Sequence, residues 1–156
     1  MKKYILILIL ILASVLSLYK LESFPDGLNA DEAALGYNAY SLLLTGKDEH
    51  AHPWPINLES FGDYKPALYA YILIPFIKVF GLTEFAVRSP GALFGAFSVL
   101  AFYFLAFSIF QDRKIGLLSA LLLSISPWHI NLSRASSESL VALFFIMLGF
   151  SLIIWS

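Results

Sequence analysis

The sequence predicts an all-α protein that crosses a membrane several times, and two observations carry this prediction. Apolar residues make up 59% of the 156-residue chain and charged residues only 13%, a balance far from that of soluble proteins. The apolar residues also gather into runs close to the roughly 20 residues that a helix needs to cross a bilayer. The net charge of −1 gives no reason to expect a nucleic-acid partner, and the chain has no cysteine.

Residues 4–21 form the first predicted span. Lys2 and Lys3 precede an almost unbroken run of Leu and Ile, a pattern that signal peptides share. The small residues of a cleavage site are poorly arranged here, which favours a retained helix. The lysines at its start place the amino end in the cytoplasm.

Residues 22–84 are predicted to be an extracytoplasmic loop with structure of its own. Asn29 suits an N-cap, and Glu32 at the third helical position completes a variant of the capping box. The helix should end at Thr45-Gly46 and lie on the membrane surface. Most of the eleven acidic residues lie in this loop: Glu22, Asp26, Asp31, Glu32, Asp48, Glu49, Glu59 and Asp63.

Residues 67–80 allow two topologies, because the segment is apolar but only fourteen residues long. If it spans the bilayer, the next helix is inverted and Arg113-Lys114 face outward. If it lies in the interface, Arg113-Lys114 join Lys2-Lys3 in the cytoplasm. The short length and the positive-inside rule favour the second topology.

Three further spans follow on this topology, over residues 85–110, 115–132 and 138–156. Gly91 and Gly95 form a GxxxG pair, so another helix should pack closely there. No polar flank follows the last apolar run, and we interpret residues 1–156 as the N-terminal part of a longer membrane domain.

The adjacent carboxylates Asp31 and Glu32 are the first candidates for chemistry. Acids in the first turn of a helix complement its dipole, by about 0.3–1 kcal/mol each, and many such pairs do only that. A carboxylate held in the first turn is also suited to accept a proton from an attacking hydroxyl, a role that contributes roughly 10²–10⁴-fold in rate.

Two basic residues are candidate ligands of a phosphate. Pro66 favours a helix start, which places Lys65 beside a helix N-terminus, where a bound anion would be stabilised. Arg88 lies near the outer end of the second span. The plainer interpretations are a snorkelling lysine for Lys65 and an ion pair with Glu84, four residues away, for Arg88.

The remaining polar patterns carry less information. Arg134 and Glu138 are four residues apart at the outer end of the last helical hairpin, where they would neutralise each other. His50 and His52 resemble a metal-binding pair, but solvated loop residues are the better interpretation, and the sequence gives no firm case for a metal. It also lacks a nucleotide-binding signature, so if the site transfers a group, an activated donor carried by a membrane lipid fits better than a soluble nucleotide.

An ordered set of motifs resembles the GT-C membrane glycosyltransferases, specifically the family-39-like group of protein O-mannosyltransferases and lipid A aminoarabinose transferases. The resemblance runs through nearly the whole chain. Its pieces are Asp31-Glu32, Thr45-Gly46, Phe61-Gly62-Asp63-Tyr64-Lys65-Pro66 with Leu68-Tyr69, Phe80-Gly81, Glu84 to Pro90 with Leu93-Phe94-Gly95, Ile115 to Leu118, Ser126-Pro127 and Ser133-Arg134.

The resemblance implies a fold with two juxtamembrane helices in the first outer loop and assigns roles to the matching residues. Asp31 resembles the catalytic carboxylate, and Glu32 the neighbour that shapes the site. Lys65, Arg88 and Arg134 resemble the groups that bind the donor phosphate, with Tyr64 and Glu138 in support. The family often has Lys-Pro-Pro where this chain has Lys65-Pro66-Ala67, and its members have many more spans.

The function that follows is transfer of a sugar, with inversion, from a polyprenyl- or dolichyl-phosphate donor to an acceptor hydroxyl outside the cytoplasm. The acceptor is a protein, a lipid or a glycan. The alternative is a non-enzymatic membrane protein, such as a transporter or a lipid-handling module. Transporters more often carry ionisable residues near the bilayer midplane, whereas the spans predicted here carry charge only near their ends.

Overall fold

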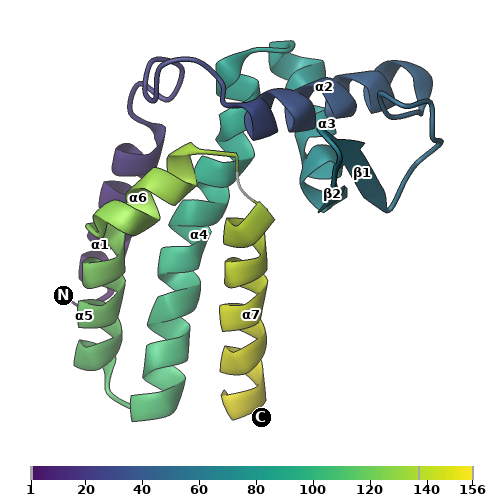
Figure 1. Cartoon of the computed structure of the whole chain (residues 1–156). Helices are drawn as coiled ribbons and strands as arrows, with labels where there is room; N and C mark the ends of the chain where they lie inside the picture. Colours follow the sequence, from purple (N-terminus) through teal and green to yellow (C-terminus); the bar gives the residue numbers. More distant parts are fainter. Residues whose placement is uncertain (1, 137, 156) are drawn as a thin grey trace.

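The computed structural model describes residues 2–136 and 138–155 and divides them into a helical bundle and a polar region at one end of it (Figure 1). The bundle is built on α4 (Glu84–Phe110), which packs against α1 (Lys2–Leu18), α5 (Arg113–Ser124), α6 (Pro127–Arg134) and α7 (Glu138–Trp155). The polar region holds α2 (Ala30–Thr45), the strands β1 (Asn57–Ser60) and β2 (Asp63–Pro66), and α3 (Leu68–Phe80).

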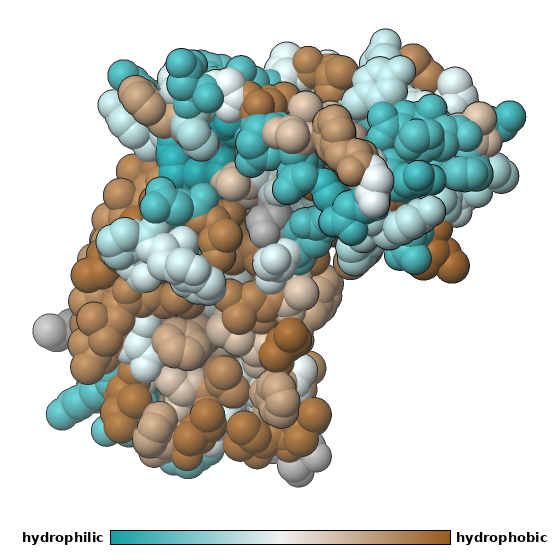
Figure 2. All heavy atoms as spheres, in the orientation of Figure 1, coloured by the Kyte–Doolittle hydropathy of each residue, from teal (hydrophilic) through white to brown (hydrophobic). Residues whose placement is uncertain are grey.

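The surface of the molecule follows this division. Apolar side chains cover the face of the bundle in Figure 2, whereas polar side chains gather over the region that contains α2. By length and composition, α4 and α7 can each cross a membrane, and α5 with α6 can form a third span if the bent pair is counted as one. The mostly helical, multi-pass architecture predicted from the sequence is confirmed.

The span expected over residues 115–132 is not one continuous helix. The chain bends by 59° between α5 and α6, at Ile125 and Ser126. Pro127 causes the break, because proline has no N–H to donate and disfavours a helical conformation at the residue before it. Ser126 is accordingly extended, with φ −68° and ψ 120°, and Pro127 begins α6.

The helices α2 and α3 are the two that were expected between the first two spans. Asn29 and Glu32 form the predicted capping box, and α2 ends at Gly46 in the left-handed conformation. The thirteen residues of α3 extend only about 20 Å, short of a hydrocarbon core of about 30 Å. A shared core joins the two helices, with Leu35, Ala39 and Leu42 of α2 beside Tyr69, Ala70 and Leu73 of α3.

The β-hairpin was not predicted. Its strands pair Leu58 with Lys65 and Ser60 with Asp63. Phe61 and Gly62, between them, both have positive φ, of 52° and 75°, as in the type I′ turns that join two-residue hairpins. The expected helix start at Pro66 is therefore displaced: Pro66 ends β2, and α3 begins at Leu68.

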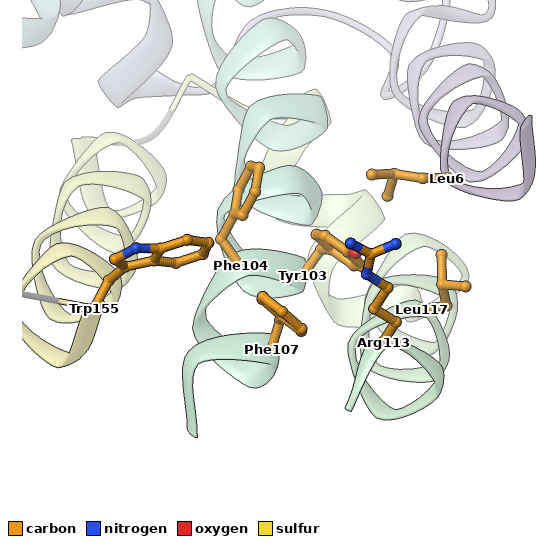
Figure 3. A pocket seen from close by; sticks show the side chains of 7 residues that line it. All are labelled: Leu6, Tyr103, Phe104, Phe107, Arg113, Leu117 and Trp155. Atoms are coloured by element: carbon orange, nitrogen blue, oxygen red, sulfur yellow. The ribbon is translucent and has the colours of Figure 1, made fainter. Parts of the chain in front are cut away.

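A cavity of about 320 Å³ at the other end of the bundle shows which segments meet there (Figure 3). Leu6 of α1 and Arg113 of α5 both line it, beside Tyr103 and Phe107 of α4 and Trp155 of α7. The start of α1 and the α4–α5 connection therefore share one end of the bundle, as the favoured topology requires. No lining residue is a carboxylate, so the cavity offers no obvious general base.

The GxxxG pair marks a close helix contact, as predicted, and the partner is α6. A Cβ atom added to Gly95 would lie 2.4 Å from Ser133 Cβ, and one added to Gly91 would lie 2.9 Å from the Ala135 carbonyl oxygen. Gly149 of α7 differs, since its Cβ would meet nothing within 4 Å.

We expect Gly95→Ala to lower the free energy of unfolding by about 1–3 kcal/mol, because the new methyl group overpacks a tight contact. Gly149→Ala is the matched control and should be neutral or slightly stabilising, because it adds the same methyl group in open space. Unfolding of the full chain in detergent, followed by circular dichroism, measures both. Equal effects of the two substitutions would contradict the packing of α6 on α4.

Candidate functional site

The first turn of α2 is fixed by its own cap. Asn29 Oδ1 accepts a hydrogen bond from Glu32 N at 2.8 Å, and Glu32 Oε2 accepts one from Asn29 N at 3.0 Å. These reciprocal bonds satisfy two N–H groups that a helix start leaves free. These local hydrogen bonds alone thus fix the backbone that carries Asp31 and Glu32.

The two acidic residues of this turn have opposite environments. The side chain of Glu32 is completely buried, whereas that of Asp31 is 66% exposed. Neighbouring residues on a helix point about 100° apart, so one faces the bundle while the other faces outward. The pair that resembles one acidic motif in the sequence is therefore two separate sites.

Glu32 forms a buried ion pair with Arg88, 56 residues further along the chain. Arg88 Nε lies 2.8 Å from Glu32 Oε1, and Nη2 lies 3.1 Å from Oε2. The backbone N–H of Ser136, just before α7, also donates to Oε1 at 3.2 Å. With the bond from Asn29, the carboxylate accepts four hydrogen bonds and joins α2, α4 and the α6–α7 connection.

These contacts decide the charge state of Glu32. Burial alone would raise its pKa, because a buried carboxylate loses hydration. The hydrogen bonds from Arg88, Asn29 and Ser136 and the charge of Arg88 outweigh burial and hold the pKa of Glu32 below its ordinary value of 4.5. Glu32 is therefore ionised at neutral pH but enclosed by protein donors.

Arg88 uses its remaining donors on the connection between α1 and α2. Nη1 donates to the carbonyl oxygens of Leu21 at 3.2 Å and Pro25 at 2.8 Å, and Nη2 donates to that of Gly27. Glu84 is the i,i+4 partner suggested by the sequence, and its Oε2 lies 3.7 Å from Arg88 Nη1. The five N–H groups of the guanidinium thus all meet protein acceptors.

Arg134 binds the end of α1 and the same connection between α1 and α2. Its guanidinium donates to the carbonyl oxygens of Leu16 and Ser17 at the end of α1, at 3.0 and 3.3 Å, and to those of Lys20 and Phe24, at 3.3 and 2.8 Å. A cation at a helix C-terminus satisfies free carbonyls and complements the dipole. Two arginines from distant parts of the chain therefore bind residues 16–27.

The ion pair expected between Arg134 and Glu138 is not formed within the described residues. Arg134 ends α6 and Glu138 begins α7, so the i,i+4 argument, which needs a continuous helix, does not apply. Glu138 instead lines a cavity of about 140 Å³ with Pro66, Tyr69 and Val141.

Asp31 meets Lys65, 34 residues away, in an ion pair at the surface of the polar region. The Lys65 side chain is only 14% exposed, and it reaches Asp31 from β2, not from a helix N-terminus as the sequence analysis expected. Tyr64 precedes it on the strand and is exposed. Since successive strand residues point to opposite faces, Tyr64 is directed away from the side that carries Lys65.

The two histidines of the polar region belong to a structured loop. Asp48 is buried and accepts hydrogen bonds from the backbone N–H groups of His50 and His52, at 3.0 and 2.7 Å. His52 Nδ1 lies 3.3 Å from the same carboxylate. In the part of the chain that the structure describes, no three His, Asp or Glu side chains are placed to hold a metal ion.

We expect a double-mutant cycle to reveal the energetic coupling between Glu32 and Arg88. Glu32→Gln should lower the free energy of unfolding by about 3–5 kcal/mol, because it leaves the buried guanidinium without a counter-charge. Combining it with Arg88→Met should cost less than the sum of the two single changes. Chemical unfolding of the full chain in detergent gives all three values.

Glu84→Gln is the matched control, since Glu84 also lies near Arg88 but is partly exposed. Its effect should stay below about 1 kcal/mol. A similar loss in Glu84→Gln and Glu32→Gln, or strict additivity in the cycle, would contradict the central role of the buried pair.

The sequence model of the family described as "Dolichyl-phosphate-mannose-protein mannosyltransferase" matches residues 7–156. A protein of Aquifex aeolicus (strain VF5), described as uncharacterized, is 32% identical over 159 residues, which cover 99% of this chain and 29% of that protein. The chain thus spans under a third of the length of this relative. No solved structure gives a significant match.

Proposed function

This chain belongs to the dolichyl-phosphate-mannose-protein mannosyltransferase family, and on that basis we propose that it forms part of a membrane enzyme that transfers a sugar from a lipid-phosphate donor to an acceptor hydroxyl. The family description names a dolichyl-phosphate-linked mannose and a protein acceptor. We propose a polyprenyl- or dolichyl-phosphate sugar as the donor. The observation that carries the proposal is the exposed Asp31 carboxylate, which contacts a lysine and stands on a helix start held by buried contacts.

In the proposed reaction, Asp31 is the general base. Its carboxylate takes the proton of the acceptor hydroxyl while the hydroxyl oxygen attacks C1 of the sugar. The bond between C1 and the phosphate oxygen breaks, and C1 is inverted. Lys65 stabilises the negative charge that develops on the departing phosphate by a charge-assisted hydrogen bond. When the donor phosphate pairs with Lys65, the Asp31 carboxylate is released from its present ion pair and can accept a proton.

The contacts favour a different role for the two arginines than the phosphate binding expected from the sequence. Arg88 and Arg134 donate to protein carbonyls and, for Arg88, to Glu32. We therefore propose that Arg88 and Glu32 position Asp31 and that Arg134 positions the α1–α2 connection. Glu138 and Tyr64 remain candidates for contacts with substrate, since Glu138 lines a cavity and Tyr64 is exposed.

A non-enzymatic membrane protein is the second hypothesis, and the position of the charges argues against it. Transporters more often carry ionisable residues near the middle of their spans. The spanning helix α4 carries Glu84 and Arg88 only in its first turns, and α7 carries Glu138 only at its start.

We expect Asp31→Asn to abolish transfer, with a loss of at least about 10²-fold in kcat, because the amide cannot accept the proton. The assay follows a radiolabelled polyprenyl-phosphate hexose in membranes that contain the complete reading frame. Asp112→Asn is the matched control: it makes the same change at the far end of the bundle, where Asn can still cap α5. Near-normal turnover of Asp31→Asn would remove the base assignment.

We also propose that the polar region faces away from the cytoplasm. Because the chain has no cysteine, single cysteines at the exposed positions His50 and Lys114 can be labelled selectively. In right-side-out vesicles a membrane-impermeant maleimide should label the cysteine at position 50 and not that at 114, and opening the vesicles should expose the second. Labelling of both before the vesicles are opened would contradict this topology.

A further inference from the structure

A side-chain hydroxyl of α3 bridges two backbone groups in the first turns of α4. Val87 O and Gly91 N are the groups that pair with each other in an uninterrupted helix. Here Gly91 N donates to the hydroxyl of Tyr69 at 3.0 Å, and that hydroxyl donates to Val87 O at 3.2 Å. Pro90 lies in the same turn and already weakens it, because it has no N–H and crowds the preceding turn. A side chain of α3 therefore hydrogen-bonds both of these backbone groups of α4.

A second hydroxyl reaches the same carbonyl. Ser136 Oγ donates to Val87 O at 2.9 Å, while the N–H of Ser136 donates to Glu32. Gly91 leaves room for this arrangement, since a Cβ atom there would lie 3.2 Å from the Tyr69 hydroxyl. Tyr69 is completely buried and Ser136 nearly so, so water does not compete for these groups.

The Tyr69 hydroxyl bridge joins the two halves of the proposed site. Arg88 is the residue next to Val87, and it holds Glu32 and therefore the helix start that carries Asp31. Lys65 lies four residues before Tyr69 in the sequence, and only Ala67 separates β2 from α3. Asp31 is thus tied to this turn of α4 through Glu32 and Arg88, whereas Lys65 is tied to it through Tyr69.

We propose that Tyr69 is a positioning residue for the transfer reaction: its hydroxyl, bridging Val87 O and Gly91 N, fixes the placement of Lys65 relative to Asp31. This inference rests on the proposed function. Without the hydroxyl, this turn of α4 loses its two hydrogen bonds to α3. Arg88, in the same turn, would then no longer be held in a fixed position relative to α3. A displacement of about 1 Å between groups that act together can cost on the order of 10²-fold in rate.

The test compares two tyrosines of one helix. Tyr69→Phe removes only the hydroxyl that hydrogen-bonds the α4 backbone. Tyr71→Phe is the matched control, because its hydroxyl also donates to a backbone carbonyl, that of Pro55 at 2.6 Å, and forms no hydrogen bond with α4 among the described residues. We expect Tyr69→Phe to lower kcat by about 10- to 100-fold while the KM for the lipid-linked sugar changes less than about threefold. Tyr71→Phe should leave both within about twofold.

Thermal unfolding of both variants separates positioning from stability. If Tyr69→Phe keeps its kcat, or if both variants lose kcat in proportion to lost stability, the inference is overturned. If Tyr69→Phe fails to fold, Ser136→Ala is tested in its place, because it removes the other hydroxyl that donates to Val87 O. We expect it to lower kcat by a smaller factor at unchanged KM. An unchanged kcat would overturn the inference. Wild-type protein that transfers no sugar would instead reject the proposed function.

Discussion

The buried pair of Glu32 and Arg88 is the interaction on which the rest of the structure depends. Removing both charges from water is costly, and only full satisfaction of their hydrogen-bonding groups makes it tolerable. Here the carboxylate accepts from two backbone N–H groups besides the arginine, and the guanidinium donates to three carbonyls besides the carboxylate. These partners come from four separate segments, so the pair can form only when the segments are correctly assembled.

The connection between α1 and α2 shows why two arginines are needed. It has no regular secondary structure before α2 begins, and its backbone carbonyls need donors that neither helix nor sheet supplies. Arg88 and Arg134 provide them from α4 and α6. Arginine suits this task because its planar group presents five donors and keeps its charge at any physiological pH. The two arginines belong to the bundle, and their hydrogen bonds connect the polar region to it.

What could be predicted from the sequence was mostly local. The capping box, the end of α2 at Gly46 and the glycine contact of α4 all depend on residues a few positions apart. The break before Pro127 was visible in principle, because Ser-Pro inside an apolar run is a typical helix boundary. The hairpin was hidden because its strands have four residues each and Pro66 favours a helix start equally well.

The residues of the candidate site could be named from the sequence, but their pairings could not. A buried arginine in an apolar span requires a carboxylate, and the sequence offered Glu84 on the same helix as the nearest one. The choice of Glu32 depends on where α2 crosses α4, and that crossing follows from the packing of the whole polar region. For the same reason no local pattern predicted that Lys65 would meet Asp31 or that Arg134 would turn away from Glu138.

Helix geometry accounts for the division of roles that we propose for Asp31 and Glu32. A base that accepts a proton must be reachable, but it must also be held in place, because effective catalysis depends on a fixed geometry. One exposed carboxylate on a free loop meets only the first requirement. Two consecutive acids in a capped first turn meet both, since the helix directs one into the bundle and the other outward. Glu32 is buried and bound by Arg88, and we propose that this contact keeps its exposed neighbour in position for the reaction.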